Sequence, residues 1–235
     1  MSTAPRRKRK TIRANVRIRS APVVLSTDAA LELVRSAGYI ALDPLCRCRE
    51  ERSCKRYPSS FACLYLGPGS EGLVASGVAK PISVDEAVGH VQKARDLGLV
   101  HMVLWTSEML RSLGPGAGRA LELCACCPCC CISRRTGDGQ QAYVDGIVGL
   151  GLARAEGACD GCGACAGVCP LNAITLEDGH PLVNADRCKG CGRCARACSQ
   201  GAIRVHPLEM VPGYSDGWTL TPAKKYYDAM HSVVR

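Results

Sequence analysis

Two copies of one cysteine pattern, placed 29 residues apart, constrain this chain more than any other feature. The segments CDGCGACAGVCPLNAI (159–174) and CKGCGRCARACSQGAI (188–203) are identical at nine of sixteen positions. The identical positions include four cysteines, two glycines and a closing Ala-Ile pair in each copy, and each Ala-Ile pair is expected to start a short strand. The period is too short for a solenoid of two units, so it predicts one pseudo-symmetric domain over residues 157–206.

Each copy spaces its cysteines as C-x2-C-x2-C-x3-C, which is the ligand spacing of a four-iron cluster. Three thiolates in a tight loop bind one cluster, and the fourth, one helical turn later, points to the other cluster. Glycines between the ligands let the backbone turn sharply there. Two zinc ribbons are the alternative, but their C-x2-C knuckles usually lie further apart. The expected ligands of two [4Fe-4S] clusters are therefore Cys159, Cys162, Cys165 and Cys198 for the first, and Cys188, Cys191, Cys194 and Cys169 for the second.

Residues 157–206 resemble a bacterial dicluster [4Fe-4S] ferredoxin, and Pro170 matches the proline that ends the first motif of that family. The second copy departs from the family pattern, because Ser199 follows its last cysteine. The first 131 residues are similar to a cysteine-rich, ferredoxin-like group of iron–sulfur proteins from anaerobes, and together with the repeat this resemblance covers most of residues 23–205. This resemblance implies electron transfer in anaerobic metabolism and names no substrate. The segments that carry it are 41–50, 62–69, 81–101 and 124–131.

Ten further cysteines precede the repeat, and we expect them to bind metal. Buried inert thiols explain isolated cysteines, but they poorly explain six within eight residues. We expect one further iron–sulfur or zinc centre here, or two centres that share the segment. A redox-active disulfide pair or a persulfide-carrying thiol is the remaining alternative. The candidates are Cys46, Cys48, Cys54, Cys63, Cys124, Cys126, Cys127, Cys129, Cys130 and Cys131.

Single polar residues near these cysteines are open to two interpretations. Arg47 and Arg49 flank Cys48, where they would either offset the charge of a metal centre or lie exposed on a loop. His101 is expected to be a hydrogen-bonded core histidine rather than a ligand, and His90 a surface residue.

The expected fold class is α+β, with a pseudo-two-fold dicluster domain at the C-terminal end and a small mixed α/β domain before it. Ser26 predicts the N-cap of a helix that ends near Ser36. Residues 83–97 predict a second helix, because Ser83 and Glu86 have capping-box spacing. The apolar residues of this helix are spaced for one buried face: Val84, Ala87, Val88, Val91 and Ala94. Residues 99–105 predict a buried strand. The expected parts are a basic arm (1–20), the mixed α/β domain (21–116), a loop-rich cysteine segment and linker (117–156), the dicluster domain (157–206) and a tail with a last helix over 222–233 (207–235).

Charge is concentrated in the arm. Residues 1–20 contain eight Lys and Arg and no acid, so they supply +8 of the net charge of +9. The arm is expected to be a solvated tail or a docking element for an acidic redox partner. Nucleic-acid binding is not expected, because aromatic residues are only 4% and the arm has none. The sequence shows neither a secretory signal nor a transmembrane run, which favours the cytoplasm, where thiols stay reduced.

The favoured hypothesis is an electron carrier or oxidoreductase subunit rather than a stand-alone enzyme. It would pass single electrons through two [4Fe-4S] clusters to or from a partner oxidoreductase or an N-terminal metal centre. A second hypothesis makes the centre at 124–131 catalytic, with the ferredoxin-like domain supplying electrons. A third is an iron–sulfur redox-sensing regulator that binds DNA, but the helix over 83–97 carries only Lys93 and Arg95 as basic residues.

Overall fold

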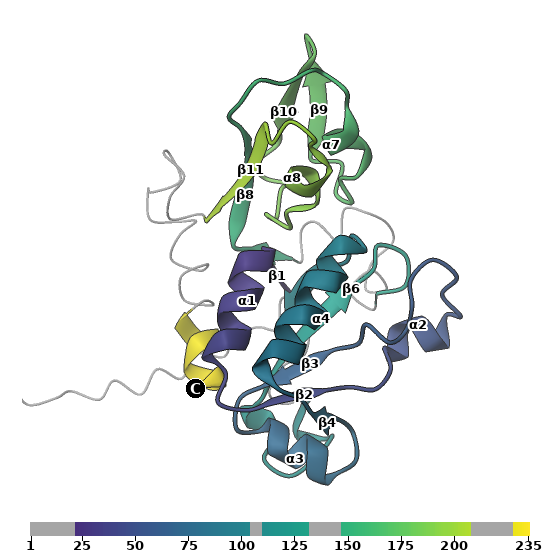
Figure 1. The fold of residues 1–235 in the computed structure, drawn as a ribbon, viewed down its shortest axis with the longest axis vertical. Coiled ribbons are helices and arrows are strands. Elements are labelled where there is room, and N and C mark those ends of the chain that lie inside the picture. Colours follow the sequence, from purple (N-terminus) through teal and green to yellow (C-terminus); the bar gives the residue numbers. More distant parts are fainter. Residues whose placement is uncertain (1–21, 104–109, 132–146, 208–227) are drawn as a thin grey trace, which may run out of the picture.

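The computed structural model describes residues 22–103, 110–131, 147–207 and 228–235. They form two parts, which we call the sheet domain and the repeat domain (Figure 1). The sheet domain lies within residues 22–149 and includes the helical residues 228–234, and the repeat domain spans residues 151–207. Among the described residues, every helix is too short or too polar to span a bilayer.

The sheet domain is built on one seven-stranded mixed sheet with strand order β4-β2-β3-β6-β5-β1-β7. Neighbouring strands pair antiparallel, except β1 and β7, which pair parallel. Of the strand expected over 99–105, residues 100–103 form β5, and residues 104 and 105 lie outside the described residues. The strands are β1 Val23–Leu25, β2 Ile40–Leu42, β3 Leu64–Leu66, β4 Lys80–Pro81, β5 Val100–Val103, β6 Leu121–Cys126 and β7 Val148–Gly149.

Strand β6 lies in the middle of the sheet, between β3 and β5, and all six of its residues are buried. Successive side chains of a strand point to opposite faces of the sheet. Leu121 and Leu123 therefore join the core beneath the helices. Cys124 and Cys126 join a separate cluster with Met102 on the opposite face. Leu121, Leu123 and Ala125 share one face of the strand, and Glu122, Cys124 and Cys126 share the other, so this strand separates an apolar core from one that contains thiols.

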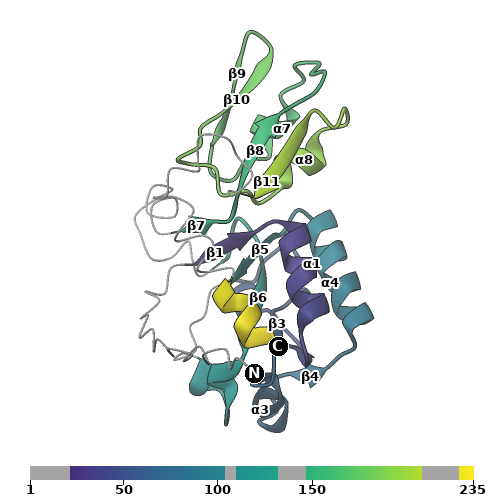
Figure 2. The same cartoon turned by 90° about the vertical axis from the view of Figure 1, so that its left-hand side faces the viewer.

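Helices cover one face of the sheet, and they begin at the expected caps. In Figures 1 and 2, α1 (Thr27–Ser36) and α4 (Val84–Asp96) lie side by side on that face. The Ser26 hydroxyl accepts the backbone N–H of Ala29, with 3.2 Å between the two atoms. The predicted capping box of Ser83 is also present, which confirms the local signal in the sequence.

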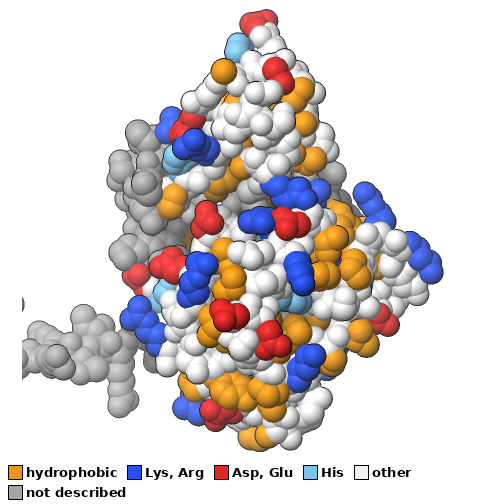
Figure 3. Space-filling model, viewed as in Figure 1, with side chains coloured by type: hydrophobic (Ala, Val, Ile, Leu, Met, Phe, Trp, Pro, Cys, Tyr) orange, Lys and Arg blue, Asp and Glu red, His pale blue; other side chains and the backbone are white. Residues whose placement is uncertain are grey.

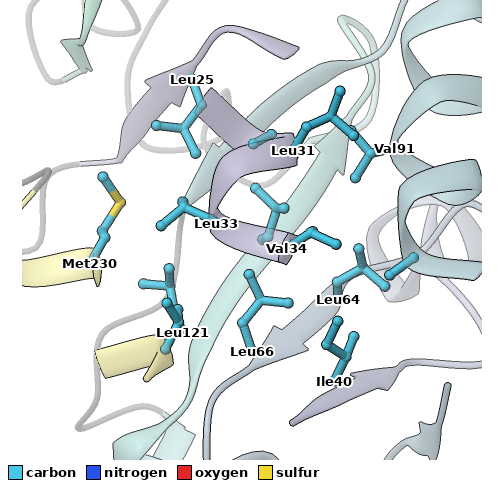
Figure 4. Close-up of a cluster of buried hydrophobic side chains, with 14 of the residues drawn as sticks. Leu25, Leu31, Leu33, Val34, Ile40, Leu64, Leu66, Val91, Leu121 and Met230 are labelled. Atoms are coloured by element: carbon cyan, nitrogen blue, oxygen red, sulfur yellow. The ribbon is translucent and has the colours of Figure 1, made fainter. Parts of the chain in front are cut away.

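The core between this helical layer and the sheet is aliphatic. Leu33 of α1 and Val91 of α4 are buried over the sheet, and Met230 from residues 228–234 closes the same cluster (Figure 4). Val84, which the helical pattern placed on the buried face of α4, is instead 40% exposed. Three short helices complete the sheet domain: α2 (Arg47–Glu51), α3 (Ser70–Ala75) and the 3-10 helix η1 (Ala117–Arg119).

The repeat domain consists of two short helices and two strand pairs. Strands β9 and β11 begin at Ile174 and Ile203, as the Ala-Ile pairs that close each sequence copy predict. Strand β9 pairs with β10, and β11 pairs with β8, in both cases antiparallel. The elements are β8 Gly151–Ala155, α7 Ala164–Gly167, β9 Ile174–Glu177, β10 His180–Val183, α8 Arg193–Ala197 and β11 Ile203–Pro207.

The structure differs from the expected division of the chain in two places. Residues 117–156, expected to be rich in loops, supply the central strand β6 as well as β7 and β8. Because β8 pairs with β11, the repeat domain begins before the expected residue 157. The basic arm over 1–20 lies outside the described residues, as does most of the tail; of the helix expected over 222–233, only residues from 228 onward are described.

The two domains meet along the loop at 188–192. A Cβ on Gly149 of β7, in the sheet domain, would lie 2.6 Å from the Cα of Lys189 in this loop, so only glycine fits there. The Arg196 guanidinium in α8 donates a hydrogen bond to the backbone oxygen of Asp96 at the end of α4. The second cysteine loop is therefore pressed against the sheet domain.

Candidate metal centres

The structure gathers four thiols around the second loop. Cys169, which belongs to the first sequence copy, lines one cavity together with the three cysteines of the second copy, Cys188, Cys191 and Cys194. Burial raises the pKa of Cys191 to about 11 and that of Cys194 to about 12. Thiolates at this position therefore require a compensating positive charge, which a bound metal would supply.

Backbone N–H groups point at the sulfurs of this set. The Ala173 N–H donates to the Cys169 sulfur, with 3.3 Å between nitrogen and sulfur, and the Ala153 N–H donates to the Cys188 sulfur at 3.4 Å. Such bonds stabilise thiolate charge, and in iron–sulfur sites they set the reduction potential.

Around the first loop, the structure brings three of the expected ligands together. Burial is the main reason why the pKa of Cys165 is raised, and the nearby charges of Cys159 and Cys162 raise it further. Cys198 lies at the C-terminal end of α8, and its sulfur accepts the N–H of Ala202 at 3.2 Å.

The turn after Cys198 reaches the first loop through a side-chain contact. Gln200 donates from Nε2 to Oδ2 of Asp160, with 3.4 Å between these atoms. A Cβ on Gly157 would also lie 3.3 Å from the Cα of Ala202. These contacts place the turn that carries the fourth expected ligand beside the first loop.

The local backbone fits ligands of this kind in both loops. Gly161 and Gly190 have positive φ of 72° and 67°, and Gly163 and Gly192 have 73° and 80°. The last two are the N-caps of α7 and α8, so each loop turns in the left-handed region before its helix. Thiol donors, facing N–H groups and glycine turns together fit two four-iron clusters.

The ten N-terminal cysteines do not form one site. The sulfurs of four of them lie within 4.8 Å of one another, and we call these the outer thiols. Cys63 and Cys124, together with Oε of Glu122, form a second set within the same limit, which we call the inner group. The outer thiols are Cys54, Cys127, Cys129 and Cys130.

Strand β6 explains why the two sets are separate. Cys124 and the carboxylate of Glu122 occupy the face of the sheet opposite the helices, whereas Cys127 and Cys130 pack with Ala125 and the end of α4. Sequence reasoning missed Glu122, although a charged residue in the buried run LELCAC was the signal that could have found it.

The remaining cysteines adjoin the inner group. Hydrogen bonds from Cys126 and Cys63 hold the pKa of Cys124 well below its usual value. Cys126 in turn contacts Cys131, and the hydrogen bonds with Cys124 and Cys131 raise the pKa of Cys126. Cys46 and Cys48 hydrogen-bond to each other, which raises the pKa of Cys46.

One arginine lies between the two sets. Arg49 is only 1% exposed, and it donates to the carbonyl oxygens of Pro58 (3.0 Å), Phe61 (2.8 Å) and Ala125. Burial alone would lower the pKa of Arg49, but nearby Cys46 and other thiols outweigh that effect and raise it. Arg49 is therefore a buried cation that can offset negative charge on the thiols, whereas Arg47 is exposed.

The two histidines belong to neither set. His101 is buried, as expected, but its Nε2 has no hydrogen-bond partner among the described residues. Burial lowers the pKa of His101 to about 4, so it is neutral at physiological pH. His90 is half-buried rather than on the surface: its Nε2 lies 3.1 Å from the Ala62 oxygen and its ring stacks at a tilt on Phe61.

Comparison with known proteins identifies the repeat domain. A family model described as a 4Fe-4S dicluster domain matches residues 152–199, about a fifth of the chain, and this range contains all eight cysteines of the repeat. No curated protein and no solved structure matches the chain. The molecule is therefore a mixed α/β protein that carries a ferredoxin-type 4Fe-4S dicluster domain.

Proposed function

We propose that this protein carries single electrons through two [4Fe-4S] clusters and exchanges them with a partner oxidoreductase or with an N-terminal metal centre. The observation that carries the proposal is the position of Cys169 in the cavity lined by Cys188, Cys191 and Cys194. Ligands exchanged between the two loops keep both clusters close inside one small domain, which suits one-electron hopping. The clusters supply the redox chemistry when bound, and the protein binds, insulates and tunes them.

The finer features of the proposal follow from the same domain. The matching glycine turns at Gly161 and Gly190 support a pseudo-two-fold relation between the halves and a bacterial type of dicluster ferredoxin. Low-potential clusters of this kind suit anaerobic metabolism in the cytoplasm. We propose Cys159, Cys162, Cys165 and Cys198 as ligands of the first cluster, and Cys188, Cys191, Cys194 and Cys169 as ligands of the second.

We expect anaerobically purified protein to contain about eight iron and eight sulfide ions per chain in these clusters. Reduction with dithionite should add one electron to each cluster and give a paramagnetic resonance spectrum of two interacting spins, because the clusters are neighbours. The measurement combines iron and sulfide analysis with low-temperature spectroscopy during a reductive titration. Protein without labile sulfide, or a titration that ends without electron uptake, would contradict the proposal.

The second cluster is the one that faces the sheet domain. Cys191 packs against the buried cluster that contains Cys124, Cys126 and Cys131. The second cluster would therefore lie beside the buried residues that include Cys124 of the inner group. This contact supports an N-terminal centre as an internal redox partner.

The same contact favours a second candidate function, in which the inner group is catalytic. Cys63, Glu122 and Cys124 provide three ligands, and metal sites with three protein ligands keep a position open for substrate. Spectral changes of this centre alone on addition of a substrate would favour the enzyme over the carrier. If the spectrum of this centre changes only when a redox partner protein is added, and with no small-molecule electron acceptor, the result would favour the carrier.

A basic groove beside Cys191 suits an acidic partner. It runs between the sheet domain and the repeat domain, and Asp28 and Asp96 are the acids in its lining. Figure 3 shows basic side chains gathered at this level of the molecule, with acidic ones among them. We propose that an acidic redox protein docks here, in addition to any role of the arm over 1–20. The arginines of the lining are Arg95, Arg193, Arg196 and Arg204.

Charge reversal at Arg204 should slow electron transfer to anions selectively. Arg204 is exposed on β11, so Arg204→Glu changes the field of the groove without removing a packed side chain. We expect oxidation of the reduced protein by tris(oxalato)cobaltate(III) to slow several-fold at low salt and oxidation by hexaamminecobalt(III) to accelerate. Arg111→Glu, exposed and outside the groove lining, is the control. Equal effects of the two variants in stopped-flow measurements would remove the docking proposal.

A further inference from the structure

The outer thiols have the spacing of ligands to one metal ion. The Cys129 sulfur lies 3.8 Å from that of Cys54 and 3.6 Å from those of Cys127 and Cys130. Metal–sulfur bonds of about 2.3 Å in a tetrahedral site place sulfurs about 3.8 Å apart. In a four-iron cluster each cysteine binds a different iron, so its sulfurs stand much further apart. The distances between the outer thiols therefore match a mononuclear site and not a cubic cluster.

The chain forms this arrangement from two separate segments. After β6 ends at Cys126, a turn carries Cys127, Cys129 and Cys130 in quick succession. The Cys130 N–H donates to the Cys127 sulfur at 3.2 Å, which orders the turn around that sulfur. Cys54 comes from the loop after α2 and completes the set, so four sulfur donors, the number that a tetrahedral ion binds, lie within 4.8 Å of one another.

The charges around the outer thiols suit a divalent ion. Four thiolates and one divalent cation leave a charge of −2, and the guanidinium of Arg49 lies near Cys127 in the buried interior. Lys55 and Arg56 follow Cys54 on the exposed side. The site is half open to solvent, because Cys129 is exposed while Cys127 and Cys130 are buried, so an ion has a path of entry.

We propose that Cys54, Cys127, Cys129 and Cys130 bind a single zinc or iron ion in a four-thiolate site. The site is separate from the inner group, which occupies the opposite face of the sheet. It fastens the loop after α2 to the turn after β6, and thereby closes the sheet domain next to the buried Arg49. The proposal does not rest on the electron-transfer function of the repeat domain.

The test compares metal and sulfide contents of the full chain after anaerobic purification. Cys54→Ser with Cys129→Ser, the two more accessible ligands, should lose one zinc or one iron per chain while labile sulfide and the resonance spectrum of the reduced clusters stay unchanged. Cys48→Ser, a partly buried thiol outside the set, is the matched control and should lose nothing. Zinc analysis distinguishes zinc from a ferrous ion, which would give a high-spin ferric resonance signal after one-electron oxidation with ferricyanide.

Two results would overturn this assignment. One is a loss of iron and sulfide together in the double variant, which would mean a cluster. The other is wild-type protein without any metal beyond its sulfide-matched iron, with Cys54 and Cys129 open to alkylation. X-ray absorption of the wild type tests the site even if the double variant does not fold. The expected spectrum shows the ion surrounded by four sulfurs at about 2.3 Å, without a second metal nearby. Loss of the sulfide-containing clusters with this ion retained would count against the proposed function alone.

Discussion

Replacing Cys169 with alanine should empty the cluster of the second loop, although Cys169 belongs to the first. Iron bound in sulfide-containing clusters is expected to fall from about eight to about four per chain, because a cluster with three thiolates is lost readily. The physical reason is the exchange of ligands: Cys169 shares a cavity with Cys188, Cys191 and Cys194. Iron and sulfide analysis measures the change.

Pairs of variants identify which cluster is lost. With crossed ligands, Cys169→Ala combined with Cys188→Ala should lose no more iron than either change alone. Cys169→Ala combined with Cys159→Ala should lose both clusters. The reverse pattern would show that each loop ligates its own cluster. Ser199→Ala, exposed beside the fourth cysteine of the second copy, is the neutral control.

Removing the buried cation at Arg49 should lower the stability of the protein more than removing the exposed cation at Arg47. Methionine fills similar volume, but it leaves the carbonyl oxygens of Pro58, Phe61 and Ala125 without their donor. It also leaves nearby Cys46 without a positive neighbour. Loss of one partner from a buried charged network costs about 3–5 kcal/mol. We expect Arg49→Met to lower the free energy of unfolding by that amount in anaerobic denaturant titrations.

Two further variants refine the role of Arg49. Arg49→Lys should recover only part of the loss, because one ammonium group lacks the planar fork that reaches several carbonyls. Arg47→Met, exposed on the same helix, should change the free energy of unfolding by less than about 0.5 kcal/mol. Equal stabilities of the two methionine variants would show that the buried cation is dispensable.

Features with local signals could be predicted from the sequence. The helices α1 and α4 start at Ser26 and Ser83 because capping depends on residues within one turn. The strands after each cysteine loop begin at the Ala-Ile pairs for a similarly local reason. The proposal of the eight repeat cysteines as cluster ligands comes from their spacing alone, since each loop and its helix are short.

Features that depend on strand pairing could not be predicted from the sequence. Six cysteines lie close together in the sequence over residues 124–131. Nothing in their spacing reveals that β6 pairs with β3 and β5. That pairing sorts Cys124 from Cys127 and brings Cys63 and Cys54 to different faces. Strand β8 was missed because glycines at 149 and 151 interrupt its apolar pattern, and its partner β11 lies about fifty residues away in the chain.

Because side chains alternate along β6, the register of this strand decides which thiols lie on each face of the sheet. Deleting one residue between Leu121 and Cys124 would turn every following side chain over, so that thiols of the helix-free side would face α4. The face of the sheet on which Cys124 and Cys126 lie is therefore set by the pleat of β6. A shift of β6 by a single position would move both of its thiols at once, whereas replacing one cysteine changes a single donor.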